Sequence, residues 1–448
     1  MLPFDCTNST RKNRMKLAPL LAIFAAVWCG AQAPAPILSA NPPMEALSLA
    51  DAKREAVTNS PTLAALRARV SAASAVWRQA RASQAPTLSA SYAASRLQHQ
   101  PTGGFSTGGP ESATSLALDL EYLLYDGGAR KHQISATEHD HLAEELSLQE
   151  GLRGLRFAVA RAYLGILLAE ARGQVAHAEQ EINAIFLRDV EVRAKLGAAA
   201  RTDALNFQLR INNAKLRVRN AVRDAHVNRF TLLALMGRAG DSHLAVQQVP
   251  IQPLNLELPE ARRQAMQQRP DLEQLREQLR AAKARVLAAG AAFKPTVTLS
   301  AQAGFSGDRL LDFREDSFGT NATAAARWQL VDGGARDAGV DAAMASVEAA
   351  DSLLTERWQT VIREVRQALE EHRSTIDKLT LYRENVSLSR TQVGDTKTRY
   401  NAGVETLTRV NEVLTELSIA EGNLAAGEIA VSLAWENVHY VLNTPSAE

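Results

Sequence analysis

The pentapeptide Asp-Gly-Gly-Ala-Arg occurs twice in the sequence, at residues 126–130 and again 206 residues later at 332–336. Further landmarks keep this offset, namely Arg193 and Arg399, Gly197 and Gly403, and Thr202 and Thr408. Upstream prolines keep an offset of 209 instead, namely Pro61 and Pro270, and Pro86 and Pro295. A shared register over most of both halves indicates an internal duplication, one structural unit used twice. Its length makes each half a large module rather than a solenoid repeat.

Each Asp-Gly-Gly lies where the hydrophobic period changes. Upstream of the first one, leucines alternate with polar residues over Ser112–Tyr125, a period of two that predicts a strand with one apolar face. Downstream, an alanine-rich stretch without proline predicts a helix from about Ala129 to Lys195. Paired glycines give the backbone freedom that a sharp turn requires, whereas both common phosphate-loop glycine patterns are absent from these sites. The predicted strand–helix junctions are Asp126, Gly127, Gly128, Asp332, Gly333 and Gly334.

The N-terminus has the pattern of a secretory signal peptide, predicted over residues 1–31. Four basic residues precede a mostly apolar run, Leu17–Val27, and small residues follow up to Ala31. A lipid-carrying Cys29 is the alternative, which the bulky Trp28 before it disfavours. Cleavage would remove both cysteines and leave a net charge of about −2, and nothing in that charge indicates nucleic-acid binding. No later apolar run reaches the roughly 20 residues of a membrane helix.

Four strands of about ten residues each are predicted, a length that crosses a bilayer when the strands are tilted. They are Thr87–Leu97, Ser112–Tyr125, Thr296–Phe305 and Asn321–Val331. In the second strand, we expect Leu118 and Leu120 to face lipid, and Asp119 and Glu121 to face a lumen. Four strands cannot close a barrel, and lipid does not tolerate an open edge, so the barrel must be shared among chains. Two chains would leave little lumen, whereas three would give twelve strands and room for a channel.

The rest of the chain is predicted to be mainly helical, with helices over Ala46–Val57 and Thr62–Ser83 before the first strand. After the long helix, Thr202 or Asp203 is expected to cap the next one, which ends near Gly237. Apolar and small residues recur along it at heptad spacing, as they do 206 residues later. The two sets are Phe207, Ile211, Ala214, Val218, Ala221 and Ala225, and Val413, Leu417, Ala420, Leu424, Gly427 and Val431. This seam predicts an extended coiled-coil wall, with an ordinary buried core helix as the alternative.

The domain organisation follows from the repeat. After the signal peptide, a first repeat spans 44–237 and a second spans 260–443, each with a helix, two barrel strands and long helices. A proline-containing connector, 238–259, joins them, and 444–448 form a C-terminal tail.

In this order, the features resemble the TolC family of outer-membrane efflux proteins. The resemblance covers roughly 44–443 and includes the leading pattern that runs from Leu49 through Asn59-Ser60-Pro61 to Leu63. It implies a homotrimer with a twelve-stranded barrel in outer-membrane lipid, continued by a long periplasmic α-helical barrel. It also implies a passive exit duct of a tripartite efflux pump or type I secretion system, for small molecules or polypeptides. Its partners would be a periplasmic adaptor protein and an inner-membrane transporter.

The resemblance also assigns the helix tips to the periplasmic entrance of the channel. The tip turns carry Arg193, Gly197, Arg399 and Gly403. In similar proteins, acidic residues six and nine positions after the second tip glycine narrow the entrance. Those positions hold Arg409 and Glu412 here, and Asp203 and Asn206 in the first repeat, which departs from a strongly acidic gate. Arg409 and Glu412 are spaced to pair with each other on one helix.

An enzyme would need a site, and the densest titratable cluster is Glu138, His139, Asp140, His141, Glu144 and Glu145. Glu138 and His141 have the spacing of a di-metal ligand pair, but the neighbouring His139 and His141 point apart on a helix, so we predict a solvated charged face. His372 lies on an apolar stripe and is predicted to pack between helices. No catalytic, cofactor or metal site is therefore expected. A periplasmic coiled-coil adaptor or scaffold without a channel is the other alternative, but it does not explain four amphipathic strands.

Overall fold

The computed structural model describes residues 46–97, 111–196, 200–238, 244–251, 256–307 and 315–444, which belong to the compact unit Met44–Glu448. The predicted signal peptide at 1–31, Gly197 in the first tip and residues 445–448 of the tail lie outside the described residues.

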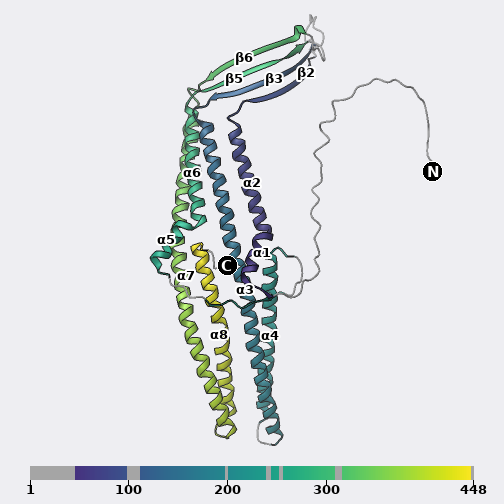
Figure 1. Cartoon of the computed structure of the whole chain (residues 1–448), viewed down its shortest axis with the longest axis vertical. Coiled ribbons are helices and arrows are strands. Elements are labelled where there is room, and N and C mark those ends of the chain that lie inside the picture. The colour runs from purple at the N-terminus through teal and green to yellow at the C-terminus, as the bar shows by residue number, and fades with distance from the viewer. Residues whose placement is uncertain are drawn as a thin grey trace, which may run out of the picture. The chain divides into compact units, whose positions relative to one another are not determined.

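Eight helices account for most of the described chain (Figure 1). They are α1 (Leu49–Asn59), α2 (Pro61–Ala82), α3 (Ala129–Lys195), α4 (Arg201–Leu235), α5 (Leu258–Gln268), α6 (Pro270–Gly290), α7 (Ala335–Asn401) and α8 (Leu407–Leu442). The bounds of α3 coincide with those predicted. Helices α3 and α7 both have 67 residues, so each is about 100 Å long at about 1.5 Å per residue. They begin and end 206 residues apart.

The first helix begins later than predicted, because residues 46–47 pair with another segment. Strand β1 (Ala46–Leu47) runs parallel to β4 (Ala245–Val246). Ser48 then caps α1, because its hydroxyl accepts a hydrogen bond from the amide of Asp51 at 3.1 Å. The predicted start at Ala46 is therefore wrong by three residues.

The four long strands form one antiparallel sheet in the order β2-β3-β5-β6 (Figure 1). They are β2 (Thr87–Leu97), β3 (Glu111–Tyr125), β5 (Thr296–Gly307) and β6 (Phe318–Arg327). The register aligns apolar residues in one row, Leu88, Leu120, Ala301 and Ala322, and polar residues in the next, Ser89, Asp119, Gln302 and Asn321. Alternate residues point to opposite faces, so the predicted apolar face runs through all four strands.

Several details of the strands differ from the predictions. Strand β6 begins at Phe318 rather than Asn321, β3 begins at Glu111 rather than Ser112, and β5 ends at Gly307 rather than Phe305. The β3–β5 register shifts between Leu123 and Tyr125, so Leu124 leaves the predicted alternation. Strand β6 ends at Arg327 rather than Val331, because β5 begins at Thr296, directly opposite Arg327. The residues after Arg327 therefore have no strand beside them within the described chain.

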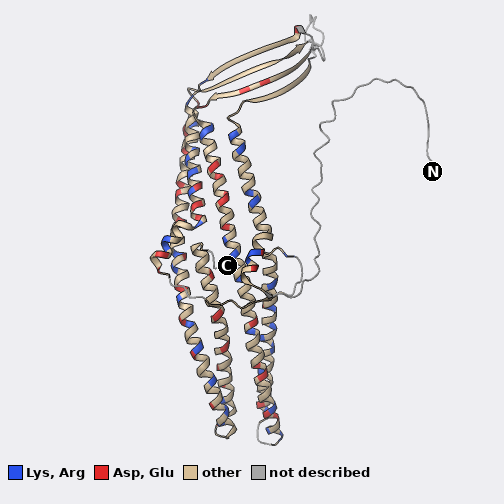
Figure 2. Ribbon diagram, viewed as in Figure 1, with Lys and Arg blue, Asp and Glu red and all other residues tan. Residues whose placement is uncertain are grey.

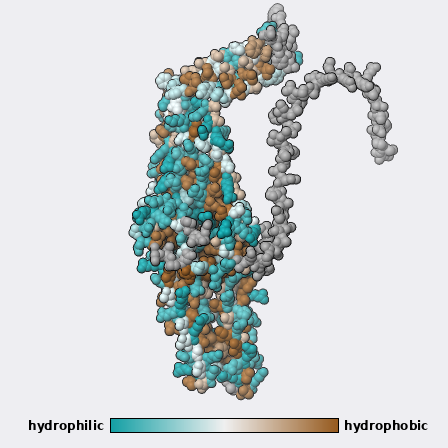
Figure 3. Space-filling view, viewed as in Figure 1, coloured by the Kyte–Doolittle hydropathy of each residue, from teal (hydrophilic) through white to brown (hydrophobic). Residues whose placement is uncertain are grey.

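The sheet and the helices have different surfaces. Charged residues are frequent along the helices and sparse in the sheet (Figure 2). In the space-filling view, the visible face of the sheet is rich in apolar residues, whereas much of the neighbouring helical surface is hydrophilic (Figure 3). The charged residues of the four strands are Arg96, Glu111, Asp119, Glu121 and Arg327.

The helices pack around two hydrophobic cores, and corresponding residues of the two halves are buried in them. Ala52 and Ala56 of α1 are fully buried against α3 and α4. Ala261 and Ala265, 209 residues later, are fully buried in the cluster of α5, α7 and α8. The heptad residues of α4 and α8 are buried or half-buried, as the predicted seam requires. At Gly427, a Cβ atom would lie 2.7 Å from the Tyr382 ring, so this glycine permits the close approach of α8 to α7.

Candidate functional site

The first strand–helix junction is held by the side chain of Asp126. Its Oδ1 accepts from the amide of Gly128 at 3.0 Å, and its Oδ2 accepts from the amide and Nε of Arg130 at 2.9 and 2.8 Å. Burial raises the pKa of Asp126, but the hydrogen bonds from Arg130 and Gly128 outweigh it and hold that pKa below its usual value. Both glycines have positive φ, 69° at Gly127 and 96° at Gly128.

The second junction repeats this geometry. Asp332 accepts from the amide of Gly334 at 3.1 Å, and from the amide and Nε of Arg336 at 3.1 and 2.6 Å. The hydrogen bond from the Arg336 guanidinium is the main cause that lowers the pKa of Asp332. The φ angles of Gly333 and Gly334 are 69° and 89°. At each junction, the aspartate side chain therefore ties the turn to the start of a 67-residue helix.

At the second tip, α7 ends in a Schellman motif. Gly403 has a φ of 75°, its amide donates to the Tyr400 carbonyl at 3.0 Å, and the Val404 amide donates to the Arg399 carbonyl at 3.0 Å. Thr406 then caps α8 by accepting from the amide of Arg409 at 3.3 Å. Two backbone hydrogen bonds and the hydroxyl of Thr406 therefore fix the conformation of this turn.

The first tip begins its second helix differently. The N-cap of α4 is Ala200, the residue that corresponds to Thr406, and it makes no side-chain cap. The predicted cap by Thr202 or Asp203 is wrong, because both residues lie inside the helix. The alanine side chain has no oxygen, and the Asp203 amide donates instead to the backbone carbonyl of Ala200 at 3.1 Å, so the two tips differ in their capping.

The four predicted entrance residues lie near the tips. Arg409 donates from Nη1 to Glu412 Oε2 at 2.9 Å, and the two side chains are 43% and 54% exposed. Asp203 is half-buried and Asn206 is exposed on α4. The structure thus joins Arg409 to Glu412.

The tip arginines also differ. The Arg193 guanidinium lies 4.7 Å from the ring centre of Tyr400 on the other hairpin and contacts Asp189 at 3.1 Å. Burial raises the pKa of Tyr400, and the positive charge of Arg193 opposes that rise. Arg399 is exposed. Only the first tip arginine therefore links the two hairpins by a cation–π contact.

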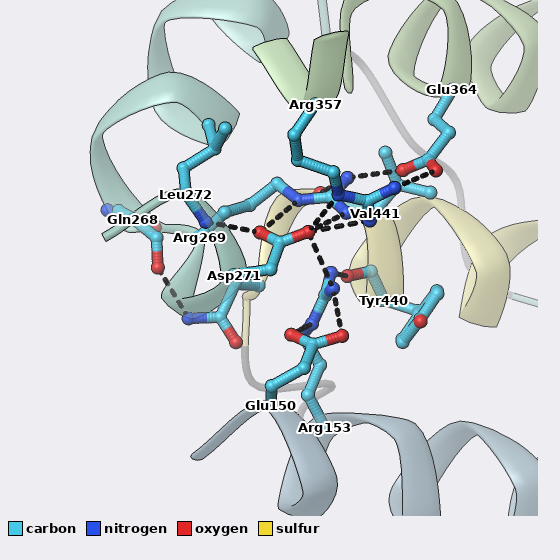
Figure 4. A network of polar contacts seen from close by, with 11 residues as sticks. Glu150, Arg153, Gln268, Arg269, Asp271, Leu272, Arg357, Glu364, Tyr440 and Val441 are labelled. Atoms are coloured by element: carbon cyan, nitrogen blue, oxygen red, sulfur yellow. Dashed lines mark hydrogen bonds and ion pairs between the residues drawn. The ribbon is translucent and has the colours of Figure 1, made fainter. Parts of the chain in front are cut away.

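A buried ion-pair network that sequence reasoning missed lies where α3, α6, α7 and α8 meet (Figure 4). The carboxylate of Asp271 accepts from Arg269 Nη2 at 2.7 Å and from Arg357 Nε at 2.8 Å, and Arg153 lies 3.7 Å away. Burial raises the pKa of Asp271, but the arginines outweigh it and lower that pKa to about 2. Arg269, whose side chain is fully buried, also donates to Glu364 at 2.6 Å.

The acid-rich and histidine-rich stretch at the start of α3 is solvated only in part: Glu138 and Glu145 are exposed, as predicted, but other members contact neighbouring helices. His139 contacts Glu277 of α6 at 2.7 Å, Asp140 pairs with Arg285 of α6, and the ring of His141 stacks on Trp77 of α2 at 5.9 Å. Among the described residues, no group of three or more His, Cys, Asp and Glu side chains could hold a metal ion. This stretch therefore joins helices.

His372 is buried, as a residue that packs between helices should be. Burial lowers its pKa, because the charged imidazolium is disfavoured away from water.

None of the helices in the described ranges is both long enough and apolar enough to cross a membrane. A family profile described as "Outer membrane efflux protein" matches residues 53–238 and 261–444. The chain belongs to this family of outer membrane efflux proteins. The resemblance inferred from the sequence is thereby confirmed.

Individual relatives agree with the family. The chain is 27% identical over 390 residues to the pyoverdine export outer membrane protein OpmQ of Pseudomonas aeruginosa, across 82% of this chain and 79% of that one. A solved membrane protein from Pseudomonas aeruginosa has a TM-score of 0.80 at 24% identity, over 88% of this chain and 93% of that one. The open state of the Neisseria gonorrhoeae MtrE outer membrane channel has a TM-score of 0.76 at 19% identity, with 88% of both chains covered.

As an outer membrane efflux protein, the chain is located in the cell outer membrane and has a large periplasmic helical portion. The mainly helical fold with one four-stranded sheet is that of the solved channels of this kind.

Proposed function

We propose that three copies of this outer membrane efflux protein form a passive exit duct. In this assembly, three four-stranded sheets make a twelve-stranded barrel in outer-membrane lipid, and the helices form a periplasmic tunnel below it. The observation that carries the proposal is the sheet itself. It has one continuous apolar face, and both outer strands lack a partner among the described residues. Lipid does not tolerate such edges, so further copies are needed to cover them.

The duct would receive its cargo from an inner-membrane transporter through a periplasmic adaptor protein that docks on the helix tips. Small molecules are the first cargo class to test, because OpmQ is named for the export of pyoverdine, while polypeptides of a type I secretion system are the second. We further propose that 44–237 and 260–443 are copies of one unit joined by the connector 238–259. The two matches of the family profile support this division. We also propose that the protein is not an enzyme.

The proposal is tested with purified, detergent-solubilised protein. We expect the mass of a trimer by sedimentation, a heat-sensitive trimer band on gels, and ion-conducting channels in planar lipid bilayers. A monomeric protein that remains with the soluble periplasmic fraction and never conducts would instead favour the coiled-coil scaffold. Cross-linking at the two tips in cells, followed by mass spectrometry of the products, would identify the adaptor.

A further inference from the structure

The outer edge of β6 has the features of an edge that pairs with a strand of another molecule. Every residue of β6 is exposed. Beyond its end, Trp328, Leu330 and Val331 are 61%, 72% and 85% exposed. The residues that correspond to them in the first repeat, 122–125, lie beside β5. Tyr122 is half-buried, and Leu124 and Tyr125 are 50% and 46% exposed. Each of these side chains is therefore more exposed in the second repeat than in the first, which indicates a missing neighbour.

The internal repeat says which strand is missing. An offset of 206 relates β3 to β6, and an offset of 209 relates β2 to β5, whereas within the chain β3 pairs with β5. Applying both offsets to that pairing gives β6 of one copy beside β2 of another copy. We propose that adjacent copies pair in this register, with Ala324 opposite the partner's Ala94. The inference rests on the proposed trimer and adds to it the residues that meet.

The faces of the two strands agree with this register. Within the chain, Leu118 pairs with Ala303, and the two offsets convert this pair into Ala324 of one copy and Ala94 of the next. In the same way, the pair Leu120 and Ala301 becomes Ala326 and Tyr92. Within the chain, the separate pairings of β2 with β3 and of β5 with β6 place all of these residues on the apolar face. A slip by one residue would turn one strand's apolar side chains toward the polar face. The apolar face therefore continues unbroken from copy to copy.

The strand–helix junctions point to the same neighbour. At Gly127, an added Cβ atom would lie 2.7 Å from Lys294 Cβ and 2.9 Å from the Ala291 carbonyl oxygen, because the corner between α6 and β5 packs on this junction. At Gly333, with the same φ of 69°, no described atom lies within 4 Å of that position. The matching corner of the first repeat, 209 residues earlier, is Ala82–Ala85 between α2 and β2.

A cavity marks the place for that corner. It has a volume of about 420 Å³ and is lined by Phe293, Trp328, Leu330, Val331 and Gly333 among others. The partner's residues 82–85 would fill it, just as residues 291–294 cover the first junction.

Applying the same two offsets to the helices places the partner's α2 beside the first half of α7. Val76 of α2, and Met344 and Leu353 of α7, are all more than half exposed in the single chain. One neighbouring copy thus covers the strand edge, the junction and the helix face.

Paired cysteines test the register. The only cysteines of the sequence, Cys6 and Cys29, lie in the predicted signal peptide, so the parent protein is expected to form no disulfide. Directly opposed residues on antiparallel strands have Cα atoms about 4.5–5.5 Å apart, within the range of a disulfide. After oxidation of isolated membranes, A94C/A324C should give linked dimers and a linked trimer as the largest product on non-reducing gels. The matched pairs A94C/A322C and A94C/A326C, at diagonal separations of about 7–8 Å, should link several-fold less.

The outcomes separate this inference from the proposed trimer. Stronger linking by a control pair, or a disulfide confined to one chain, overturns the register, while the mass of the unoxidised parent reports the trimer independently. A trimeric mass with A94C/A324C unlinked refutes only the pairing, whereas a monomeric mass refutes the proposed function. As a second readout, G333A should reduce trimer yield more than G403A, because only Gly333 would face a neighbouring corner. The two glycines have similar φ, 69° and 75°, and equal open space in the single chain, so equal yields would overturn the junction contact.

Discussion

At the scale of the residue, Asp271 is the carboxylate at the centre of the buried network, where it forms ion pairs with three arginines from three parts of the chain. A carboxylate in such a position stabilises the fold only while it is ionised. Removing one partner from a buried ion-pair network leaves the other charges uncompensated, which costs about 3–5 kcal/mol. Because Arg269 is fully buried and donates to Glu364 of α7 and to the Val441 carbonyl of α8, it cannot regain water without opening its contacts with these two helices.

We therefore expect Asp271→Asn to destabilise the protein by about 3–5 kcal/mol. The folded-state pKa of Asp271, about 2, lies below its unfolded value. Its stabilisation is thus complete above the unfolded pKa of about 3.9 and is lost as pH falls toward 2, a contribution of about 2.5 kcal/mol. Thermal unfolding from pH 7 to pH 3 should show a smaller acid-induced loss in the variant than in the parent. The exposed Asp395→Asn is the matched control, and an identical acid response in all three proteins would contradict the assignment.

The paired glycines of the first junction should differ in their tolerance of a side chain. Gly127→Ala adds both left-handed strain and a collision with Lys294 and Ala291, whereas Gly128→Ala adds the strain, about 1–2 kcal/mol, and meets only His132 at 3.6 Å. We expect a lower unfolding midpoint for Gly127→Ala than for Gly128→Ala. Equal midpoints would mean that the corner between α6 and β5 yields to the added atom.

At the scale of the element, each strand carries two environments at alternating positions. Leu120 lies in the apolar row and Asp119 in the polar row, where Asp119 accepts hydrogen bonds from Ser91 at 2.9 Å and from Gln302 at 2.6 Å. A polar row held by cross-strand bonds has no reason to face hydrocarbon. The apolar row is therefore assigned to lipid in the proposed barrel.

Leu120→Arg should then reduce membrane insertion, because an arginine near the bilayer midplane costs about 2–4 kcal/mol on the lipid face. Glu121→Arg, on the other face of the same strand, should leave assembly intact. Heat-modifiable trimer in outer-membrane fractions measures both. Loss of trimer in Glu121→Arg together with normal Leu120→Arg would reverse the two faces.

The tip of α8 carries the second prediction at this scale. In the proposed trimer, Asp203, Arg409 and Glu412 would each occur three times around the axis. Arg409→Gln would then double the net negative charge of that ring, and Glu412→Gln would neutralise it. Because charges that line a narrow pore control ion passage, cation selectivity should rise in the first variant and fall in the second.

Reversal potentials under a salt gradient in planar bilayers measure this selectivity. Arg399→Gln, a charge change of the same sign at the neighbouring turn, is the control. Unchanged potentials in both entrance variants would mean that this pair is only an exposed helix contact, worth a few tenths of a kcal/mol.

At the scale of the whole molecule, the two halves share one plan and differ where they meet neighbours. The first junction is covered by the chain's own corner, and the second is open. Thr406 caps α8, whereas Ala200 leaves α4 uncapped. Arg269 and Asp271 belong to the second half alone, since the first has Ser60 and Thr62 at those positions. If the two halves are copies of one unit, as proposed, equivalent positions of the chain make distinct contacts.

The sequence by itself determined the elements and their order. Its periods of two and of about 3.6 residues separate strands from helices, because side-chain direction is fixed by backbone geometry. They placed α3 from Ala129 to Lys195 and β2 from Thr87 to Leu97. The sequence also located the two Asp-Gly-Gly turns, because their structure is local. The glycines with positive φ, and the amides that donate to the aspartate side chain, lie no more than four positions from that aspartate.

Only the tertiary structure decided which distant groups meet. His139 finds Glu277, and Asp271 finds Arg153 and Arg357, across separations that no local pattern encodes. The end of β6 at Arg327 likewise depends on where β5 begins, because a strand ends where its hydrogen-bonding partner does. Local conformational preference acts over a few residues, whereas ion pairs and strand registers are properties of surfaces that exist only after the chain has folded.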